Sequence, residues 1–359
     1  MEIPKDVLKI LKKHEGNIGR EKLSELAGIG ERPAQKYITI FKTLKAVNEE
    51  RLGQDMNLFA ESLINKLKNE KILDESKYKK PFSGKVSEEA CLVLSDVHVG
   101  KRNVFYDLEK CENITTYNTS IFLEETENLL KGVHKIVDLL KTNYDIEKLN
   151  VFCVGDLIDN DLIYKGQRFF IDACAGEQLW IAVKAFTEMF TALLEIFKEI
   201  EIISIPGNHG RKAFMEAQPS ANNFDYHLMK ILSVVFQHND NISFVVPNSW
   251  NYMHTIFDWK YYLHHGNDVY SWMSLPYYGI TRKSTKRMSE IQFDKEIIGH
   301  FHTDMRIPIS SKADTLVNGS WINRDNFAWE KFGVFSKAKQ RFFGVNKKRP
   351  ETWSFAIEL

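Results

Sequence analysis

The sequence has few cysteines, and no two of them lie close together. Cys91, Cys111, Cys153 and Cys174 form no C-x-x-C pair, which argues against a disulfide framework and against a cysteine-based structural zinc site. Cys91 and Cys153 lie inside apolar strand-like runs, so we expect them to be buried free thiols. Free thiols of this kind are typical of the reducing cytosol.

Long apolar runs and an excess of either charge are also missing. No stretch reaches the apolar length that a membrane-spanning helix needs, and the first residues lack the apolar segment of a secretory signal. The 48 Lys and Arg residues balance the 48 Asp and Glu residues, so any basic surface must be local. We therefore expect a soluble, cytoplasmic protein without a membrane partner.

Residues 1–48 show the pattern of a small helix-turn-helix module, and a chain of 359 residues can carry one beside a larger domain. Residues 5–13 and 20–27 predict two short helices, and Pro33 suits the first turn of a third. The outer face of that third helix would carry Arg32, Gln35 and Lys36 as DNA contacts. Ten Lys or Arg against six Asp or Glu in this segment fit phosphate binding, but a three-helix docking module explains the pattern equally well.

Residues 49–89 would connect this module to the rest of the chain. The stretch 49–73 predicts a charged amphipathic helix with Leu58 facing inward, and 74–89 is a polar segment with Pro81 and Gly84 that we interpret as a linker. From residue 90 to 359, short apolar runs alternate with helical patterns at 120–141, 177–199 and 224–237. That alternation is typical of an α/β domain.

Metal-binding residue types follow five apolar runs in the α/β segment. Side chains two apart on a strand point the same way, so such pairs could hold one ion from one side. A single cluster of this kind is usually a turn or a satisfied polar group, but five in one α/β context favour a shared site. In chain order the clusters are Asp96 with His98, Asp156 with Asp159, Asn208 with His209, His264 with His265, and His300 with His302.

These ligand types also indicate which ions would bind. Carboxylate, imidazole and amide oxygen, without thiolate, suit hard to borderline divalent cations. We expect two such ions, with Mn²⁺ favoured and Fe²⁺, Zn²⁺, Ni²⁺ or Mg²⁺ as alternatives.

The motif series resembles that of the calcineurin-like metallophosphoesterases, which include SbcD-type repair exonucleases, phosphatases and cyclic-nucleotide phosphodiesterases. The match spans about residues 91–320, and the order of the motifs is far more specific than any one of them. The resemblance implies a four-layer α/β/β/α sandwich, two mixed sheets flanked by helices, beside the small all-α N-terminal domain. The motifs are Asp96-x-His98, Gly155-Asp156-x-x-Asp159, Gly207-Asn208-His209, His265-Gly266 and Gly299-His300-x-His302.

The resemblance also implies a role for each residue. One metal would be bound by Asp96, His98 and His302, the other by Asn208, His265 and His300, and Asp156 would bridge the two. Two cations about 3.5–4 Å apart activate a water nucleophile and hold the phosphate oxygens. His209 would be the catalytic residue that assists the leaving group.

Two departures from the family pattern affect this assignment. The family usually has an acidic residue after the Asn-His pair, but here Gly210 and Arg211 follow, as in uncharacterised, often phage-borne relatives. The orientation of His209 is therefore open, and Arg211 is a candidate phosphate contact. In the His264-His265 doublet we assign His265 as the ligand because the family's ligand directly precedes glycine.

The substrate is less clearly indicated. Two loop-like segments near the expected site combine aromatic and basic residues, which suits stacked bases and phosphates. An aromatic cluster beside a solvated basic helix face explains them equally well. The candidate substrate contacts are Arg211, Lys165, Arg168, Tyr277 and Arg282, with Trp272 and Tyr278 among the aromatic residues.

Together these features favour a metal-dependent phosphodiesterase, and specifically a DNA nuclease or exonuclease. The alternatives are a phosphatase or cyclic-nucleotide phosphodiesterase with a small substrate, and a DNA-binding regulator whose phosphoesterase domain is inert. Related nucleases often act as homodimers with an ATPase partner, but the sequence shows no interface for either.

Overall fold

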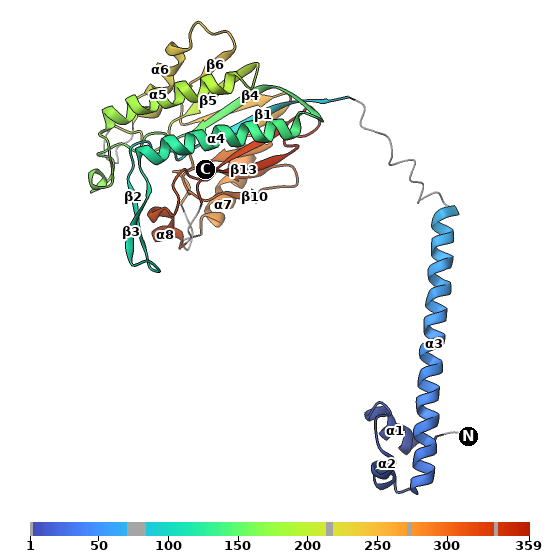
Figure 1. Cartoon of the computed structure of the whole chain (residues 1–359). Coiled ribbons are helices and arrows are strands. Elements are labelled where there is room, and N and C mark those ends of the chain that lie inside the picture. Colours follow the sequence, from blue (N-terminus) through green and yellow to red (C-terminus); the bar gives the residue numbers. More distant parts are fainter. Residues whose placement is uncertain (1–2, 70–83, 213–217, 271–274, 334–336) are drawn as a thin grey trace. The chain divides into compact units, whose positions relative to one another are not determined.

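The computed structural model describes residues 3–69, 84–212, 218–270, 275–333 and 337–359 (Figure 1), with side chains described for only some positions between 47 and 69. The chain divides into two compact units, Met1–Ser83 and Gly84–Leu359. No helix in these ranges is long and apolar enough to cross a membrane. Trp272 and residues 74–83 of the expected linker lie outside the described residues.

The N-terminal unit contains three helices, α1 (Lys5–Lys13), α2 (Arg20–Ala27) and α3 (Glu31–Asn69). Their apolar faces form one small cluster around Leu11, Leu23 and Ile38. Gly28, with φ of 61°, ends α2 in the left-handed region that glycine adopts without strain. Arg32, Gln35 and Lys36 are exposed on α3, as predicted for the outer face.

The third helix is longer than predicted. It continues through residues 48 and 49 without a break, so the helix-turn-helix segment and the amphipathic segment share one helix. Leu58 is 65% exposed, and the prediction that it faces inward is wrong. The reason is that the described apolar cluster of this unit reaches only to Phe41 along α3.

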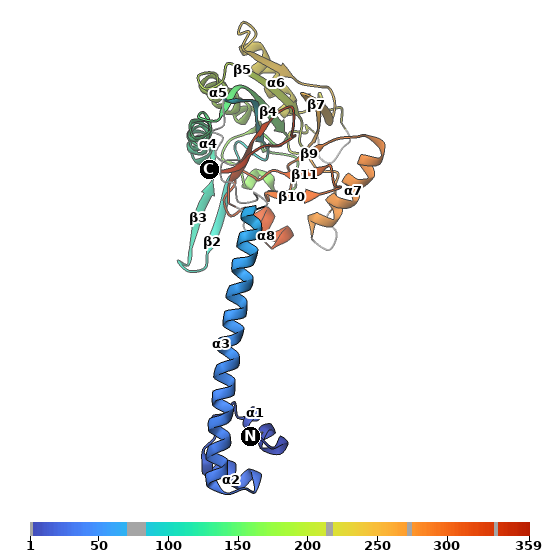
Figure 2. The same cartoon turned by 90° about the vertical axis from the view of Figure 1, so that its right-hand side faces the viewer.

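The C-terminal unit contains two mixed sheets among its described residues. The first has the strand order β13 (Ser354–Glu358), β12 (Lys339–Val345), β1 (Val86–Leu94), β4 (Tyr144–Val154), β5 (Glu199–Ile205) and β6 (Ile242–Val245). The second has the order β10 (Met305–Pro308), β11 (Asp314–Val317), β9 (Lys295–Ile298), β8 (Trp259–His264) and β7 (Asn251–Ile256). The pair β2 (Asn103–Asp107) and β3 (Glu112–Tyr117) forms a projecting hairpin (Figure 2).

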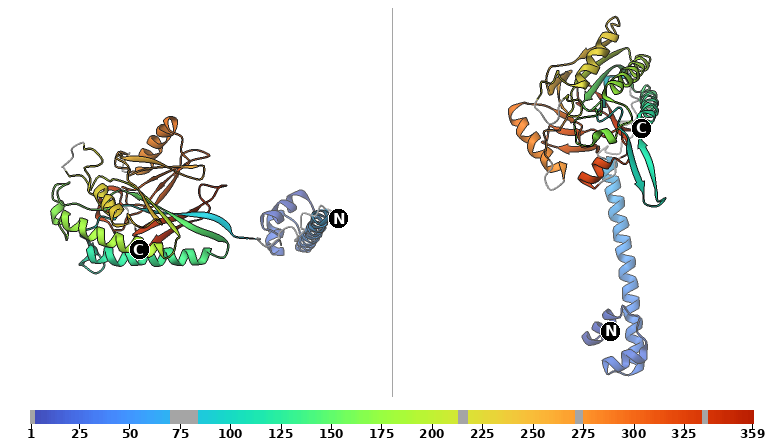
Figure 3. Two further views of the ribbon diagram at one scale, coloured as in Figure 1. Left: turned by 90° about the horizontal axis from the view of Figure 1, so that it is seen from above. Right: turned by 90° about the vertical axis from the view of Figure 1, so that its left-hand side faces the viewer.

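Helices cover the outer faces of the two sheets. The helices α4 (Thr119–Leu140), α5 (Ala175–Leu194) and α6 (Phe224–Val235) share an apolar core with the first sheet. The helix α7 (Pro276–Glu290) packs against the second sheet through Ile280. Figure 3 shows α4 and α5 on one side and α7 on the other, with the strands between. The predicted four-layer α/β/β/α sandwich with a small helical region before it is confirmed.

The strands of the first sheet are apolar on both faces because each face has its own core. In β4, Val151 and Cys153 face the helices, while Phe152 and Val154 face the second sheet. Cys91 and Cys153 are buried free thiols, as predicted. The strand β1 begins at Val86, before the expected domain start at residue 90. Its first residues are polar but have partners in the fold, since buried Glu88 accepts a hydrogen bond from Trp353.

Three parallel strands of the first sheet place their ends at one edge. The strands β1, β4 and β5 run parallel, as do β8 and β9 of the second sheet. The segments that follow these strands carry the predicted metal-binding residues. Because strands of both sheets end there, side chains from distant parts of the sequence meet.

Candidate metal centre

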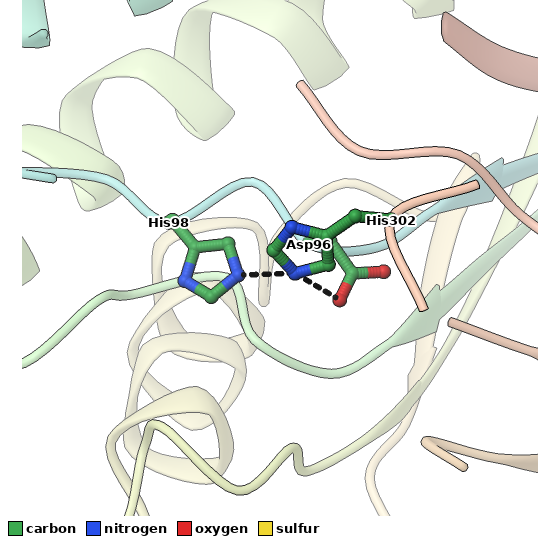
Figure 4. A group of neighbouring side chains, drawn as sticks. All are labelled: Asp96, His98 and His302. Atoms are coloured by element: carbon green, nitrogen blue, oxygen red, sulfur yellow. Dashed lines mark hydrogen bonds and ion pairs between the residues drawn. The ribbon is translucent and has the colours of Figure 1, made fainter. Parts of the chain in front are cut away.

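Three predicted ligands from the segments that follow β1 and β9 lie close together (Figure 4). Nε2 of His98 lies 3.1 Å from Nε2 of His302, which in turn lies 3.3 Å from Oδ1 of Asp96. All three side chains are buried, and one ligand atom from each falls within 4.8 Å of the others. This group could hold one cation.

A second group lies at the ends of β4, β8 and β9 and contains Asp156, His265 and His300. Nε2 of His265 is 2.9 Å from Oδ2 of Asp156, and the two imidazole rings are 5.2 Å apart. Burial lowers the pKa of His300 to about 3, which keeps the ring neutral as a metal ligand must be. Burial also lowers the pKa of His98 in the first group, to about 4.

The outer nitrogens of three histidines are already occupied, which fixes where their lone pairs point. Nδ1 of His98 donates to Asp159 and Nδ1 of His302 to Asp325. Nδ1 of His265 donates to the backbone oxygen of Val154 at 2.8 Å. In the neutral ring the remaining Nε2 is then an acceptor. Two acceptor nitrogens 3.1 Å apart, as in His98 and His302, repel each other unless a cation or proton lies between them. Burial alone would lower the pKa of His302, but Asp325 and Asp96 raise it to about 9, so without a metal a proton takes this position.

One buried atom lacks a partner that a metal could supply. Oδ1 of Asn208 is buried without a hydrogen-bond partner among the described residues. Nε2 of His265 lies 2.9 Å from Oδ2 of Asp156, and although burial would lower the pKa of His265, Asp156 raises it to about 9, so without a metal a proton joins the two groups. A buried polar atom without a partner costs about 1–3 kcal/mol, so such atoms are rare outside functional sites. The donor set of carboxylate, imidazole and amide oxygen therefore fits a pair of divalent cations.

The backbone at this site is strained. Asp96, His98, Asp156, His300 and His302 all have φ between 51° and 71°, a region that L-residues other than Asn and Asp seldom adopt. Each such residue costs on the order of 1–3 kcal/mol, and this strain is concentrated at functional sites. Gly207 allows one of the close approaches, since a Cβ there would overlap with Asp156.

His209 lies beside both groups and is 19% exposed. Its Nδ1 is 3.2 Å from Oδ1 of Asp159 and 3.0 Å from the Asp159 backbone oxygen. Burial alone would lower the pKa of His209, but the carboxylates of Asp156 and Asp159 raise it above its usual value. Asp159 thus orients the ring, although Gly210 and not an acidic residue follows His209. Gly210 has no room for a side chain, because a Cβ would overlap with the Asn223 amide.

Three supporting residues were not predicted from the sequence. Asp325, at the start of α8 (Asn326–Phe332), accepts from His302, and the hydroxyl of Tyr164 accepts from Nδ2 of Asn208 at 2.6 Å. Asp225 in the first turn of α6 accepts four backbone N–H groups from the segments after β4 and β5. An Asp or Asn near a helix start is a common cap, so the sequence offers no sign that these residues support a site.

The other predicted residues are placed as follows. His264 points away from the ligands and pairs with buried Glu296 at 2.8 Å, so the choice of His265 fits the geometry. Arg211 is partly buried beside His265, where both line a pocket of about 290 Å³. Lys165 and Arg168 are exposed around the short helix η2 (Gln167–Phe169), whose Gln167 contacts His209.

Tyr277 and Arg282 are exposed on α7. Of the basic residues on that helix, Arg287 is the one that lines the pocket beside His265.

No protein-family model and no curated protein sequence matches this chain. Vps29 from Entamoeba histolytica complexed with Zn²⁺ is a similar solved structure, 15% identical, with a TM-score of 0.32 over 72% of this chain and 87% of that one. Vps29 from Cryptosporidium parvum is 13% identical, with a TM-score of 0.33 over 72% and 86%. An uncharacterised predicted phosphoesterase from Streptococcus pneumoniae is 11% identical, with a TM-score of 0.30 over 75% and 98%.

Proposed function

We propose that this protein is a metal-dependent phosphoesterase that hydrolyses phosphodiester bonds. The observation that carries the proposal is the convergence of Asp96, His98 and His302 beside Asp156, His265 and His300, with Nε2 lone pairs of three histidines directed inward. Asp96, His98 and His302 would hold one cation, Asn208, His265 and His300 the other, and Asp156 would bridge them. Bound at these positions, two divalent cations would activate water and neutralise the phosphate.

The side chains of the protein supply the remaining steps. Water adds to phosphorus, the bond from phosphorus to the leaving oxygen breaks, and that oxygen takes a proton. His209 is suited to donate this proton because neighbouring carboxylates favour its protonated form and because its side chain is partly exposed. Asp159 holds its Nδ1, so Nε2 would be the nitrogen that gives up the proton. Arg211 would bind a non-bridging phosphate oxygen.

We further propose that the substrate is DNA and the activity that of a nuclease. Around His209, exposed Phe169 lies next to Arg168, whose guanidinium is 5.3 Å from the ring centroid. Aromatic and basic side chains together suit a single strand, on which bases stack and phosphates pair with cations. The exposed Arg32, Gln35 and Lys36 of α3 would add sequence-independent contacts to the same polymer.

The decisive experiment compares linear DNA, RNA and a generic phosphodiester with each candidate metal. Wild type should cleave DNA with Mn²⁺, while Asp156→Asn should lose at least 100-fold in kcat because the bridging carboxylate is gone. His209→Ala should lose about 100-fold on DNA, the typical contribution of a general acid. Hydrolysis of the small ester without any cleavage of DNA would instead favour a phosphatase or cyclic-nucleotide phosphodiesterase. DNA binding without hydrolysis of any ester would favour a regulator.

A further inference from the structure

A pocket of about 290 Å³ opens beside the candidate ligand His265, and of its walls only Arg211 and His265 have a role in the steps above. Its walls come from four separate places: Arg211 after β5, Trp250 before β7, Tyr262 in β8 with Asn267 after it, and Arg287 in α7. At the low end of the usual range for small-molecule sites, about 300–1,000 Å³, this volume suits one planar group and no more. A base pair would not fit.

Two of the groups that line the pocket are planar, the guanidinium of Arg211 and the indole ring of Trp250. The guanidinium of Arg211 lies 5.6 Å from the centroid of the Trp250 indole. Arg211 has no carboxylate partner among the described residues, whereas Arg287 is paired with Asp268 and Glu296. The charge of Arg211 is therefore available to an anion, while Arg287 has a structural role in the wall.

The rest of the pocket is rigid and polar. Tyr262 is buried, stacks on Phe293 with ring centroids 5.8 Å apart, and lies below the guanidinium of Arg287. The amide of Asn267, partly exposed, offers one acceptor and two donors at the same opening. A stacking surface with an amide at its edge is the arrangement by which proteins bind unpaired bases.

We propose that this pocket binds the base of the nucleotide whose phosphate is held at the metal centre. The base stacks against the Arg211–Trp250 pair, its edge meets Asn267, and its 5′-phosphate lies toward His265 and Arg211. This inference rests on the proposed phosphodiesterase activity and narrows its substrate class to nucleotides that are unpaired at the cleaved position.

Binding without catalysis is the first test. Thymidine 5′-monophosphate and inorganic phosphate are titrated into the full-length protein in EDTA, with isothermal calorimetry as the readout. Trp250→Ala should weaken thymidine monophosphate binding about tenfold or more, while Trp250→Phe retains most of it. Arg211→Gln should weaken both ligands. The control Trp180→Ala removes an indole that is 60% exposed on α5 and should bind like wild type.

Equal binding of thymidine monophosphate by wild type and Trp250→Ala overturns the proposal, as does an equal loss in Trp180→Ala. If phosphate binds as tightly as thymidine monophosphate, Arg211 binds only the anion, and the proposal that the pocket binds a base is wrong. Urea-unfolding midpoints of all variants show whether a loss of binding is caused by unfolding. If Trp250→Ala is unfolded, binding by Trp250→Phe is compared with wild type instead.

Catalysis is the second test, with Mn²⁺ and two chromogenic esters, the p-nitrophenyl ester of thymidine 5′-phosphate and methyl p-nitrophenyl phosphate. Trp250→Ala should lower kcat/KM for the nucleotide ester about tenfold more than for the methyl ester, mainly through KM. If both esters are hydrolysed with the same ratio in wild type and variant, the pocket assignment fails and the phosphoesterase function stands. If neither ester is hydrolysed with any metal, the function fails, while the calorimetry still reports on the pocket.

Discussion

One side chain beside the candidate metal centre, Asp325, affects metal binding by orienting a histidine ligand. Asp325 accepts from Nδ1 of His302, and this contact directs Nε2 of His302 toward Asp96 and His98. Partners of this kind raise the basicity of a ligand and fix its tautomer, and their loss usually weakens metal affinity about 10–100-fold. Asp325 is not itself a predicted ligand, so its effect on metal binding can be measured separately.

We expect Asp325→Asn to weaken Mn²⁺ binding about 10–100-fold in calorimetry or equilibrium dialysis. Asn can replace Asp as the cap of α8, so the helix start should be retained. Asp107→Asn, which also changes a carboxylate that accepts backbone N–H groups, is the matched control. Unchanged affinity in Asp325→Asn would show that His302 is not held by this carboxylate in solution.

Glu125 predicts a pH dependence of stability that is independent of the metal centre. It is 3% exposed in α4, and its Oε2 has no partner among the described residues. Burial, with a smaller contribution from Glu124, raises its pKa to about 9 from 4.5. Between these two values the folded protein binds a proton that the unfolded chain releases, so the free energy of unfolding falls as pH rises from 4.5 to 9.

We therefore expect Glu125→Gln to remove that fall in stability and to be more stable than wild type at pH 8, by up to about 5 kcal/mol. Urea unfolding at pH 5, 7 and 9 measures the difference. Glu124→Gln, at the exposed neighbouring position, should follow the wild-type pH curve. The same slope in Glu125→Gln and wild type would contradict a neutral buried carboxyl group.

At the scale of helices and strands, α6 holds the ligand loops together. Asp225 in its first turn accepts from the backbone N–H of Asp156, Leu157 and Ile158 after β4 and of Gly207 after β5. One carboxylate thus fixes two loops that carry candidate ligands. Burial and the nearby Asp156 raise the pKa of Asp225 to about 6, because both disfavour a negative charge at this position.

Asp225→Asn should destabilise the protein by about 3 kcal/mol, because an amide has only one acceptor oxygen and leaves buried N–H groups unpaired. Chemical unfolding measures this change, and Asp240→Asn, on an exposed residue after α6, is the control. Mn²⁺ affinity should fall as well. A variant as stable as the control would mean that the two loops hold their shape without α6.

The ligand loops could be predicted from sequence because strand periodicity and local clustering reveal them. Asp96 and His98 follow an apolar run, and residues two apart on a strand share a face. Tyr164 and Asp325 could not be predicted in this way, since each comes from a loop or helix start whose position depends on tertiary packing. The exposure of Leu58 was missed for a related reason: helical periodicity shows which residues share a face, not whether anything covers it.

At the scale of the whole molecule, the two units have separate cores. The described apolar cluster of the first unit contains only residues before 42, and those of the second contain only residues after 89. Among the described residues, each unit therefore has an apolar core of its own.

Residues 84–359 expressed alone should fold and hydrolyse the methyl ester at a rate within about twofold of the full chain, since a separate core stabilises each unit. DNA affinity should fall. In the full chain, the double change Arg32→Gln and Lys36→Gln should reproduce that loss, measured by fluorescence anisotropy at low salt, because it would remove two of the proposed phosphate contacts. Lys42→Gln, on an exposed residue of the same helix, is the control. If the shortened protein binds DNA as tightly as the full chain, α3 does not contact DNA.

The distribution of candidate ligands over the two sheets has a consequence for folding. Asp96, Asp156 and Asn208 follow strands of one sheet, while His265, His300 and His302 follow strands of the other. His98 and His302 are 204 residues apart in the chain and meet only when the sheets have packed together. A cation bound by ligands from both sheets would link the two sheets where they pack together. Its uptake should be among the last events of refolding, and its removal should first loosen the sheet-to-sheet contact, visible as faster amide exchange in β8 and β9.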